Sequence, residues 1–355
     1  MNIALLGYGT VGKAVDSILS ERDTGIRVTK IFRRPGKATA PRMTDNFESI
    51  LADDSIDVVV EVLAGKDPAF DLITRALQAG KHVVTSNKAA LANDMPGLLT
   101  LAKQKGVSLQ FEAACGGGMP IVEAVKKAVL LDEVTQFKGI LNGTCNYILD
   151  RMDRFGDAFT VALSKAQALG YAEADPTADI SGADVKNKAI IALSIAFKTP
   201  CVTDFPTSGI EKITDAQLAN FMARGKRLRL MLIAKRTATA YALGVVPVVV
   251  NADSFEASVK ENFNFAAMTC DLVGDLIFYG QGAGGKPTAD AVIQDIIAVK
   301  SQRAYLPEIN GHLAYDESIL TGTGYIGDDV IENAPLATLV RTARERGAFL
   351  AFEPN

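Results

Sequence analysis

The sequence predicts an α/β protein in which an N-terminal domain built on a parallel sheet precedes a second α+β domain with a mixed sheet. Two observations support this prediction. Over residues 1–130, short apolar runs alternate with segments of helical periodicity, which is typical of a parallel sheet with right-handed crossovers. Beyond residue 130 the alternation gives way to clustered helices and strand-like segments, which indicates a domain of another class.

Each element of the first domain follows from its own pattern. Residues 56–63 form a nearly continuous apolar run, as expected for a strand covered on both faces. Residues 10–21 place Val11, Val15 and Ile18 at helical spacing. The other predicted strands are residues 2–6, 26–32, 81–85 and 107–112, and the other predicted helices are residues 71–79 and 98–105.

The second domain is predicted from less regular patterns. An apolar helix over residues 184–197 follows a loop rich in Gly, Asp and Pro at residues 170–182. Further helices of the chain are predicted at residues 120–131, 145–154, 161–169 and 288–299, and further strands at residues 133–141, 228–235 and 241–250. A glycine-rich loop covers residues 280–287, and the tail from residue 301 has no clear periodicity.

Composition excludes several classes of protein. The chain has 355 residues with 37 Lys and Arg against 41 Asp and Glu, and this near-balance argues against a general nucleic-acid binder. The two histidines, His82 and His312, cannot supply a three-histidine metal site. Four widely spaced cysteines indicate reduced thiols in an intracellular protein. Without a signal peptide or an apolar run long enough to span a bilayer, we expect a soluble cytoplasmic protein with no membrane partner.

A glycine motif lies between the first predicted strand and the first predicted helix. Residues 7–12, GYGTVG, fit the G-x-G-x-x-G pattern, and the residues are Gly7, Tyr8, Gly9, Thr10, Val11 and Gly12. The first glycine permits a tight turn, the second lets a pyrophosphate approach the backbone, and the third allows the helix to pack on the strand. Because the motif lies between a predicted strand and a predicted helix, it predicts a dinucleotide-binding domain of the Rossmann type.

The end of the second predicted strand bears on the choice of dinucleotide. In such domains an acidic residue there accepts hydrogen bonds from the ribose 2′-hydroxyl, whereas an arginine accommodates a 2′-phosphate. This strand ends in Arg33 and Arg34, with no carboxylate nearby. The charges therefore favour NADP over NAD, unless both arginines are ordinary surface residues.

Two lysines are candidates for chemistry. Lys188 lies four residues after Asp184, so the two share a helix face where an apolar helix begins. Partial desolvation of the lysine there would suit proton transfer, but a surface ion pair explains the spacing equally well. Lys88 follows the predicted strand 81–85, at the sheet edge where ligands of α/β proteins gather, and a solvated loop lysine is the alternative.

These segments together resemble the homoserine dehydrogenase family over about residues 1–300. The matching stretches are GYGTVG (7–12), VVTSNKAALA (83–92), FEAACGGGMPIVEAV (111–125), GILNGTCNYIL (139–149), ALGYAEADPTADISGADVKNKAIIALSIAF (168–197) and GQGAGGKPTADAV (280–292). The resemblance implies NAD(P)-dependent interconversion of L-homoserine and L-aspartate 4-semialdehyde, which serves threonine, methionine and isoleucine biosynthesis.

The resemblance also implies roles for individual residues. Lys188 matches the proton donor and acceptor, Asp184 its partner and a substrate ligand, and Lys88 a lysine between substrate and cofactor. Glu173 matches the ligand of the substrate amino group, and Asp179 and Tyr171 match further substrate positions. Ala64 and Gly284 match positions that contact the cofactor. Family members bind a monovalent cation, usually Na⁺, largely through backbone carbonyls, and the matching positions are Glu112, Cys115, Gly117 and Met119.

The family further implies a homodimer and a division of the chain. Residues 1–130 match the NAD(P)-binding domain, residues 131–284 the catalytic and dimerisation domain, and residues 285–300 a helix that returns to the first domain. Residues 301–355 match no part with a known role. This tail is shorter than the regulatory domain of the ACT type that many bacterial members carry, so we expect the short form.

Two other readings of the sequence stay open. One is another semialdehyde reductase on the same architecture; a type that uses acyl phosphates would need a nucleophilic cysteine, for which Cys115 and Cys145 are candidates. The other is a non-catalytic protein that senses NAD(P). Turnover of homoserine without phosphate would exclude both.

Overall fold

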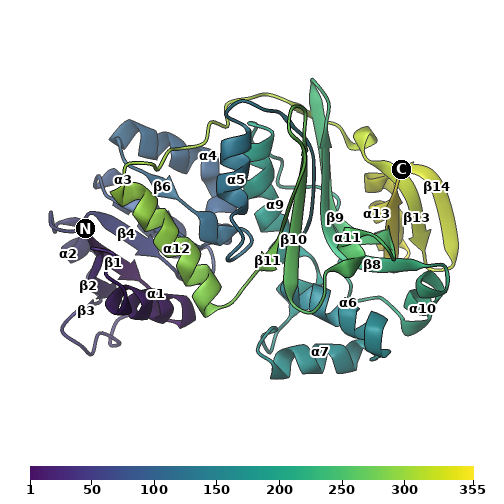
Figure 1. Cartoon of the computed structure of the whole chain (residues 1–355), viewed down its shortest axis with the longest axis horizontal. Helices are drawn as coiled ribbons and strands as arrows, with labels where there is room; N and C mark the ends of the chain where they lie inside the picture. The colour runs from purple at the N-terminus through teal and green to yellow at the C-terminus, as the bar shows by residue number, and fades with distance from the viewer. The chain divides into compact units, whose positions relative to one another are not determined.

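The computed structural model describes all residues, 1–355, and divides the chain into two compact units (Figure 1). The first comprises Met1–Ala124 and Ala283–Glu308, and the second comprises Val125–Gly282 and Ile309–Asn355. Each unit is therefore built from two separate stretches of the chain. Among the helices of both units, none has the length and apolar character needed to cross a membrane.

The first unit contains a six-stranded sheet, parallel throughout, with the order β3-β2-β1-β4-β5-β6. Its strands are β1 (Asn2–Leu6), β2 (Arg27–Phe32), β3 (Met43–Thr44), β4 (Val58–Glu61), β5 (His82–Thr85) and β6 (Leu109–Gln110). Chain order reverses at β1, which lies between β2 and β4, and ligands of such sheets bind at the carboxyl ends of the strands beside this point. The predicted fold class is confirmed for this unit.

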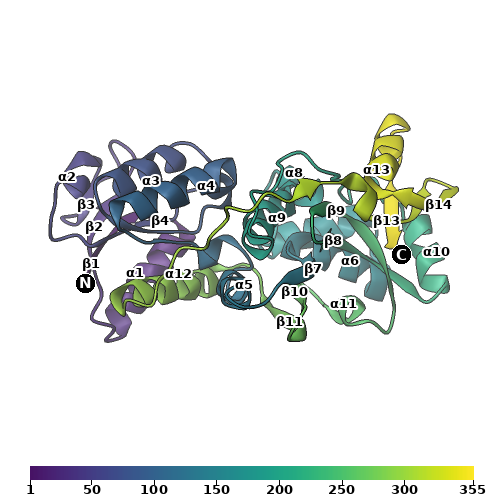
Figure 2. The same cartoon turned by 90° about the horizontal axis from the view of Figure 1, so that it is seen from above.

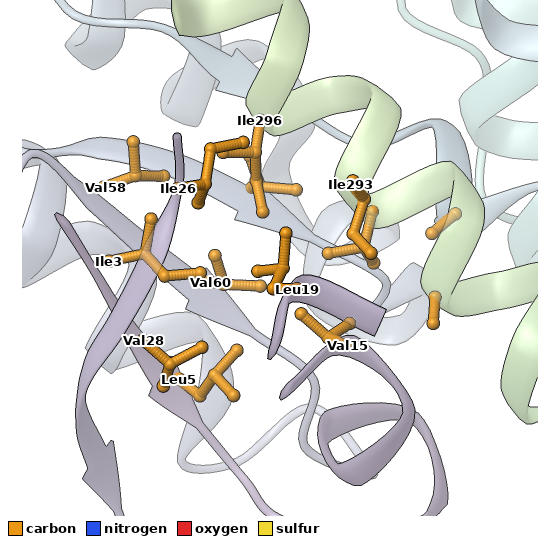
Figure 3. Packing of buried hydrophobic residues seen from close by; sticks show 14 of the residues in the cluster. Ile3, Leu5, Val15, Leu19, Ile26, Val28, Val58, Val60, Ile293 and Ile296 are labelled. Atoms are coloured by element: carbon orange, nitrogen blue, oxygen red, sulfur yellow. The ribbon is translucent and has the colours of Figure 1, made fainter. Parts of the chain in front are cut away.

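Helices cover both faces of this sheet (Figure 2). On one face lie α1 (Thr10–Glu21) and α12 (Gly285–Lys300), which contact each other although they are far apart in sequence. On the other face lie α3 (Ala69–Gln78) and α4 (Lys88–Lys105), and the short α2 (Glu48–Leu51) follows β3. Figure 3 shows Val15 and Leu19 of α1 and Ile293 and Ile296 of α12 packed with Ile3, Leu5, Val28, Val58 and Val60 of the sheet.

Helix α4 begins ten residues earlier than the sequence pattern predicts. The Asn87 side chain caps it by accepting a hydrogen bond from the Ala90 N–H, at 3.0 Å. The helix is kinked at Asp94, where φ is −163° and ψ is 66°, and it contains Pro96. Because the kink interrupts the helical period, only the part after it is visible in the sequence.

The second unit contains a mixed sheet with the order β11-β10-β7-β8-β9-β15-β13-β14, and β12 pairs with β9. Its strands are β7 (Val134–Ile140), β8 (Lys226–Arg236), β9 (Ala240–Asn251), β10 (Phe263–Cys270), β11 (Gly274–Gln281), β12 (Ala314–Tyr315), β13 (Thr321–Ile326), β14 (Asp329–Pro335) and β15 (Leu350–Pro354). Neighbouring strands are antiparallel except for the β9 pairs with β12 and β15. The predicted mixed sheet is confirmed.

Short helices connect and cover these strands. They are α6 (Gly143–Phe155), α7 (Phe159–Ala168), α8 (Thr177–Ile180), α9 (Ala183–Ala196), α10 (Asp215–Ala223), α11 (Phe255–Ser258) and α13 (Leu336–Glu345); α5 (Ile121–Ala128) spans the boundary between the units. Helices α6, α9 and α10 contact β8, and α13 contacts the strands near the C-terminus. The last residues thus add strands and a helix to the second unit, although the sequence showed no period there.

Candidate active site

The glycine turn after β1 has the geometry that the motif predicts. Gly7 has a φ of +106°, which favours glycine, and a Cβ on Gly12 would lie 2.4 Å from the Gly7 carbonyl oxygen. A Cβ on Gly9, in contrast, would meet no atom within 4 Å. Gly12 is therefore required by the fold of the turn, whereas the bare backbone at Gly9 leaves space for a ligand at the start of α1.

A second helix begins beside this turn. Gly284, with a φ of +122°, precedes α12, and a Cβ on Gly285 would lie 3.0 Å from the Thr10 side chain at the start of α1. Neither helix has a side-chain hydrogen bond from its capping residue. Because the N-terminus of a helix carries partial positive charge and donor N–H groups, the two ends together suit a pyrophosphate. The residues present thus fit a dinucleotide.

The arginines at the end of β2 differ in their surroundings. Arg33 is half-buried, its Nη1 donates to the Tyr8 carbonyl oxygen at 3.4 Å, and its guanidinium lies 5.9 Å from the centre of the Tyr8 ring. Arg34 is exposed. The Tyr8 hydroxyl donates to Asp16 at 2.7 Å, and Arg42 binds the same carboxylate through two nitrogens at 3.0 Å. Sequence reasoning missed Asp16 and Arg42, which fix the tyrosine that Arg33 contacts.

Lys88 and Ala64 lie at the same edge of the first sheet. Lys88 is the first residue of α4, three positions after the last residue of β5, and it is half-buried. Ala64 is exposed in the loop that follows β4. Both positions therefore follow the carboxyl ends of the paired strands β4 and β5, at the edge where ligands of parallel sheets gather.

The positions that match a cation site lie in one turn of the first unit. Glu112 is buried, and its carboxylate accepts hydrogen bonds from the N–H groups of Val122 and Glu123 at 3.0 and 2.7 Å. Burial, followed by Asp295, raises the pKa of Glu112 to about 8. Gly116 and Gly117 have φ values of +79° and +58°. The structure contains no cluster of three or more His, Cys, Asp or Glu side chains that could hold a metal ion.

In the second unit, Lys188 and Asp184 form a buried pair at the start of α9. The Lys188 Nζ donates to Asp184 Oδ2 at 2.7 Å and to the Leu141 carbonyl oxygen at 2.5 Å. The side chains are only 10% and 11% exposed, so the pair is not the solvated surface ion pair that the spacing also permitted. The bonds to two elements, α9 and the end of β7, give the ammonium a defined position.

A residue that sequence reasoning missed joins this pair to a further carboxylate. Asn142 is buried, and its Nδ2 donates to Asp179 Oδ1 at 2.7 Å and to Asp184 Oδ2 at 3.0 Å. Its Oδ1 accepts from the Cys145 N–H and so caps α6. Burial raises the pKa of Asp179, and the hydrogen bond from Asn142 opposes that shift. The signal in the sequence was an asparagine in a capping position before a helix.

The other two predicted substrate residues lie on the loop before α8. The Tyr171 ring packs edge-on against Tyr147 at 5.2 Å, and its carbonyl oxygen accepts from the Thr144 hydroxyl. Glu173 is exposed, and its carbonyl oxygen accepts from Gln167. Asp179, Asp184 and Lys188 are thus brought into one cluster, whereas the Glu173 carboxylate faces solvent.

The cysteines are poorly suited to covalent catalysis. Cys115 and Cys145 are fully buried, and neither forms a disulfide. The Cys145 thiol lies 3.2 Å from the Asp179 carbonyl oxygen, and burial, followed by the Asp179 carboxylate, raises its pKa well above the usual range. Because the thiolate is the nucleophile, a thiol that stays protonated argues against the alternative of an enzyme that uses acyl phosphates and a nucleophilic cysteine.

Family models match both parts of the chain. The NAD-binding domain of homoserine dehydrogenase matches residues 7–112, and the homoserine dehydrogenase domain matches residues 120–297. The chain belongs to the homoserine dehydrogenase family. The predicted family and the predicted activity, that of an NAD(P)-dependent oxidoreductase of the homoserine dehydrogenase type, are confirmed.

Individual homoserine dehydrogenases agree with this assignment. The enzyme of Pseudomonas aeruginosa is 36% identical, with 94% of this chain and 80% of the relative covered. A crystal structure from Thiobacillus denitrificans has a TM-score of 0.88 at 28% identity and covers 99% of this chain and 98% of its own. A hyperthermophilic archaeal homoserine dehydrogenase in complex with NADPH has a TM-score of 0.73 at 26% identity, with 86% and 99% covered.

Proposed function

We propose that Lys188 is the proton donor and acceptor in the interconversion of L-homoserine and L-aspartate 4-semialdehyde. The observation that supports this role is the buried ammonium, fixed by Asp184 and by the Leu141 carbonyl oxygen. When bound, NADPH would supply the hydride that reduces the aldehyde carbon. Negative charge then grows on the aldehyde oxygen, where Lys188 stabilises it and donates a proton to give the alcohol. In the oxidising direction Lys188 accepts the same proton.

The neighbouring carboxylates have separate proposed tasks. Asp184 orients Lys188 and binds substrate, and Asn142 couples it to Asp179. Glu173 is exposed and so is accessible to the substrate ammonium, to which its carboxylate would make a charge-assisted hydrogen bond. Tyr171 and Asp179 complete the proposed substrate site. Lys88 would add electrostatic stabilisation of the negative charge that develops in the reaction.

We also propose that NADP is the preferred cofactor. Gly9, Gly284 and the helix N-termini beside them would hold the pyrophosphate, together with Tyr8, Thr10 and Val11, and Ala64 would contact the cofactor through its backbone. Arg33 and Arg34 would bind the 2′-phosphate. The Tyr8 ring, fixed by Asp16, gives Arg33 a surface on which to stack.

An Arg33→Ala variant should weaken NADP binding and leave NAD binding nearly unchanged. A charge-assisted hydrogen bond contributes about 1.5–3 kcal/mol, so we expect kcat/KM for NADP to fall roughly 10- to 100-fold. Oxidation of L-homoserine is followed with each cofactor in phosphate-free buffer, which also tests the activity of the wild-type protein. Equal losses of kcat/KM with NADP and NAD would show that Arg33 does not bind the 2′-phosphate. If the wild-type protein turns over only when phosphate is added, the alternative that uses acyl phosphates is favoured.

We propose that Na⁺ binds in the turn formed by Glu112, Cys115, Gly117 and Met119. The support is the buried Glu112 carboxylate beside a backbone turned by two residues of positive φ. A bound ion stabilises the folded state by mass action, by about 2.7 kcal/mol at 100 times its Kd. The Tm should therefore rise with NaCl above its value in tetramethylammonium chloride of equal ionic strength. Identical melting curves in the two salts would remove this site.

The remaining proposals concern the division of the chain into domains, its oligomeric state and its cellular location. Residues 1–130 would bind NAD(P), residues 131–284 would carry catalysis and the contacts of a homodimer, and residues 285–300 would return the chain to the cofactor. A cytoplasmic location agrees with four cysteines that form no disulfide.

A further inference from the structure

Glu61 is a charged residue buried in the first unit, and it is not among the residues proposed to bind substrate or cofactor. It is the last residue of β4 and is fully inaccessible to solvent, although the rest of the strand is Val58, Val59 and Val60. Its Oε1 accepts from the Leu63 N–H at 2.7 Å, and its Oε2 accepts from the Thr85 hydroxyl at 2.6 Å. Burial raises the pKa of the Glu61 carboxyl, and these hydrogen bonds oppose the shift.

Asn87 connects this carboxylate to two loops. Its Nδ2 donates to Gly65 O at 2.6 Å, to Leu63 O at 3.3 Å and more weakly to Glu61 Oε1 at 3.4 Å. Its backbone N–H donates to the Thr85 hydroxyl at 3.0 Å, while its Oδ1 caps α4. Glu61 and Thr85 are partners in the register of β4 and β5. This hydrogen-bonded network therefore ties the loop after β4 to the first turn of α4, which begins with Lys88. Its members are Glu61, Leu63, Gly65, Thr85 and Asn87.

We propose that Glu61 is a positioning residue, which acts through Thr85 and Asn87 to hold Lys88 and the loop over residues 62–65 in place at the carboxyl edge of the first sheet. The inference rests on the proposed role of Lys88 in the reaction.

The chemistry of the network requires an acceptor with two oxygens. An ionised carboxylate only accepts hydrogen bonds, and it can serve the Leu63 N–H, the Thr85 hydroxyl and the Asn87 amide together. Glutamine keeps the shape but offers one oxygen and adds two donors. An apolar residue would continue the valine pattern of β4, but it would leave the Thr85 and Asn87 donors without their shared acceptor. A buried charge that sheet packing does not need is thus explained by the loops that it holds.

The test compares Glu61→Gln and Thr85→Val with a matched control. Lys81 is also charged and buried, but it lies at the opposite end of the sheet, where its Nζ donates to the Asp53 and Ile56 carbonyl oxygens. Because a displacement of about 1 Å can cost about 100-fold in rate, we expect both test variants to lower kcat about 10- to 100-fold. Their Kd for NADPH, from titration calorimetry, should change less than about threefold. Lys81→Met should lower the Tm without lowering kcat.

A double-mutant cycle with Lys88→Ala tests whether Glu61 acts through that lysine. Once Lys88 is absent, Glu61→Gln should change kcat less than about threefold. The inference would be overturned if Glu61→Gln lowered kcat as much in the Lys88→Ala background as in the wild-type protein. It would also be overturned if Glu61→Gln, like Lys81→Met, lowered the Tm without lowering kcat. Hydrogen–deuterium exchange of residues 62–65 and 86–92 gives a readout independent of activity. Faster exchange of these segments in Glu61→Gln would support the positioning role of Glu61, and unchanged exchange would overturn it. If Lys88→Ala is fully active while exchange in Glu61→Gln is faster, only the proposed role of Lys88 is overturned.

Discussion

A Lys188→Met variant should lose roughly 10²- to 10⁴-fold in kcat in both directions, the range that a positioned general acid or base contributes. Methionine keeps most of the length and apolar contact of the lysine but has no proton to exchange. The Asp184 carboxylate and the Leu141 carbonyl oxygen lose their shared donor. NADPH binding, measured by titration calorimetry, should be retained because the glycine turn and both adjacent helix N-termini belong to the other unit.

The matched control for this variant is Lys186→Met on the same helix. Lys186 is half-buried, lies 5.1 Å from the centre of the Phe205 ring and has only a loose ion pair with Asp204 at 4.0 Å. Its replacement should leave kcat within about twofold, since exposed pairs of this kind contribute about 0–1 kcal/mol. A Lys188→Met enzyme that turns over as fast as the control would show that the proton is carried elsewhere.

The second large effect is expected at the glycine turn, where Gly9→Ala should impair cofactor binding and Gly12→Ala should impair stability. Gly9→Ala places a methyl group where the protein has no atom within 4 Å. The fold and Tm should be preserved, but the methyl group occupies the space of the pyrophosphate, so the KM for NADPH should rise at least about tenfold. Gly12→Ala forces a methyl group to 2.4 Å from the Gly7 carbonyl oxygen. It should destabilise the protein by about 1–3 kcal/mol, as overpacking does.

Calorimetry and thermal melting separate these two outcomes. The proposed cofactor site requires that Gly9→Ala change binding and not stability, and that Gly12→Ala change stability. Wild-type affinity for NADPH in Gly9→Ala would mean that the cofactor does not approach this backbone.

The parts of the fold that depend on local patterns were predictable from the sequence. The run 56–63 and the glycine motif placed β1, α1 and β4 within a few residues of their observed bounds. The hairpin of β10 and β11 was missed, as were β13, β14 and β15. The strands β13, β14 and β15 are short, and each contains glycine or proline. Strand β15 pairs with β9, which lies about one hundred positions earlier in the chain. Such pairing is set by tertiary contacts and leaves no local period.

The candidate site was predictable where spacing places side chains on one face of an element. The four-residue spacing of Asp184 and Lys188 indicated the pair, but only the structure shows its burial and its bond to Leu141. Asn142 was missed because a capping asparagine is common in sequences. Glu61 had a recognisable signal, since it is the one ionisable residue inside the apolar stretch 58–63.

Chemical rescue of a Lys188→Ala variant tests proton transfer by this lysine most directly. Small primary amines of graded pKa are added to the variant with NADPH and aspartate 4-semialdehyde, together with a quaternary ammonium ion of similar size. If Lys188 transfers the proton, primary amines should restore turnover, the restored rate should vary with the pKa of the amine, and the quaternary ion should restore none. Equal rescue by the quaternary ion, which carries charge but no proton, would contradict it.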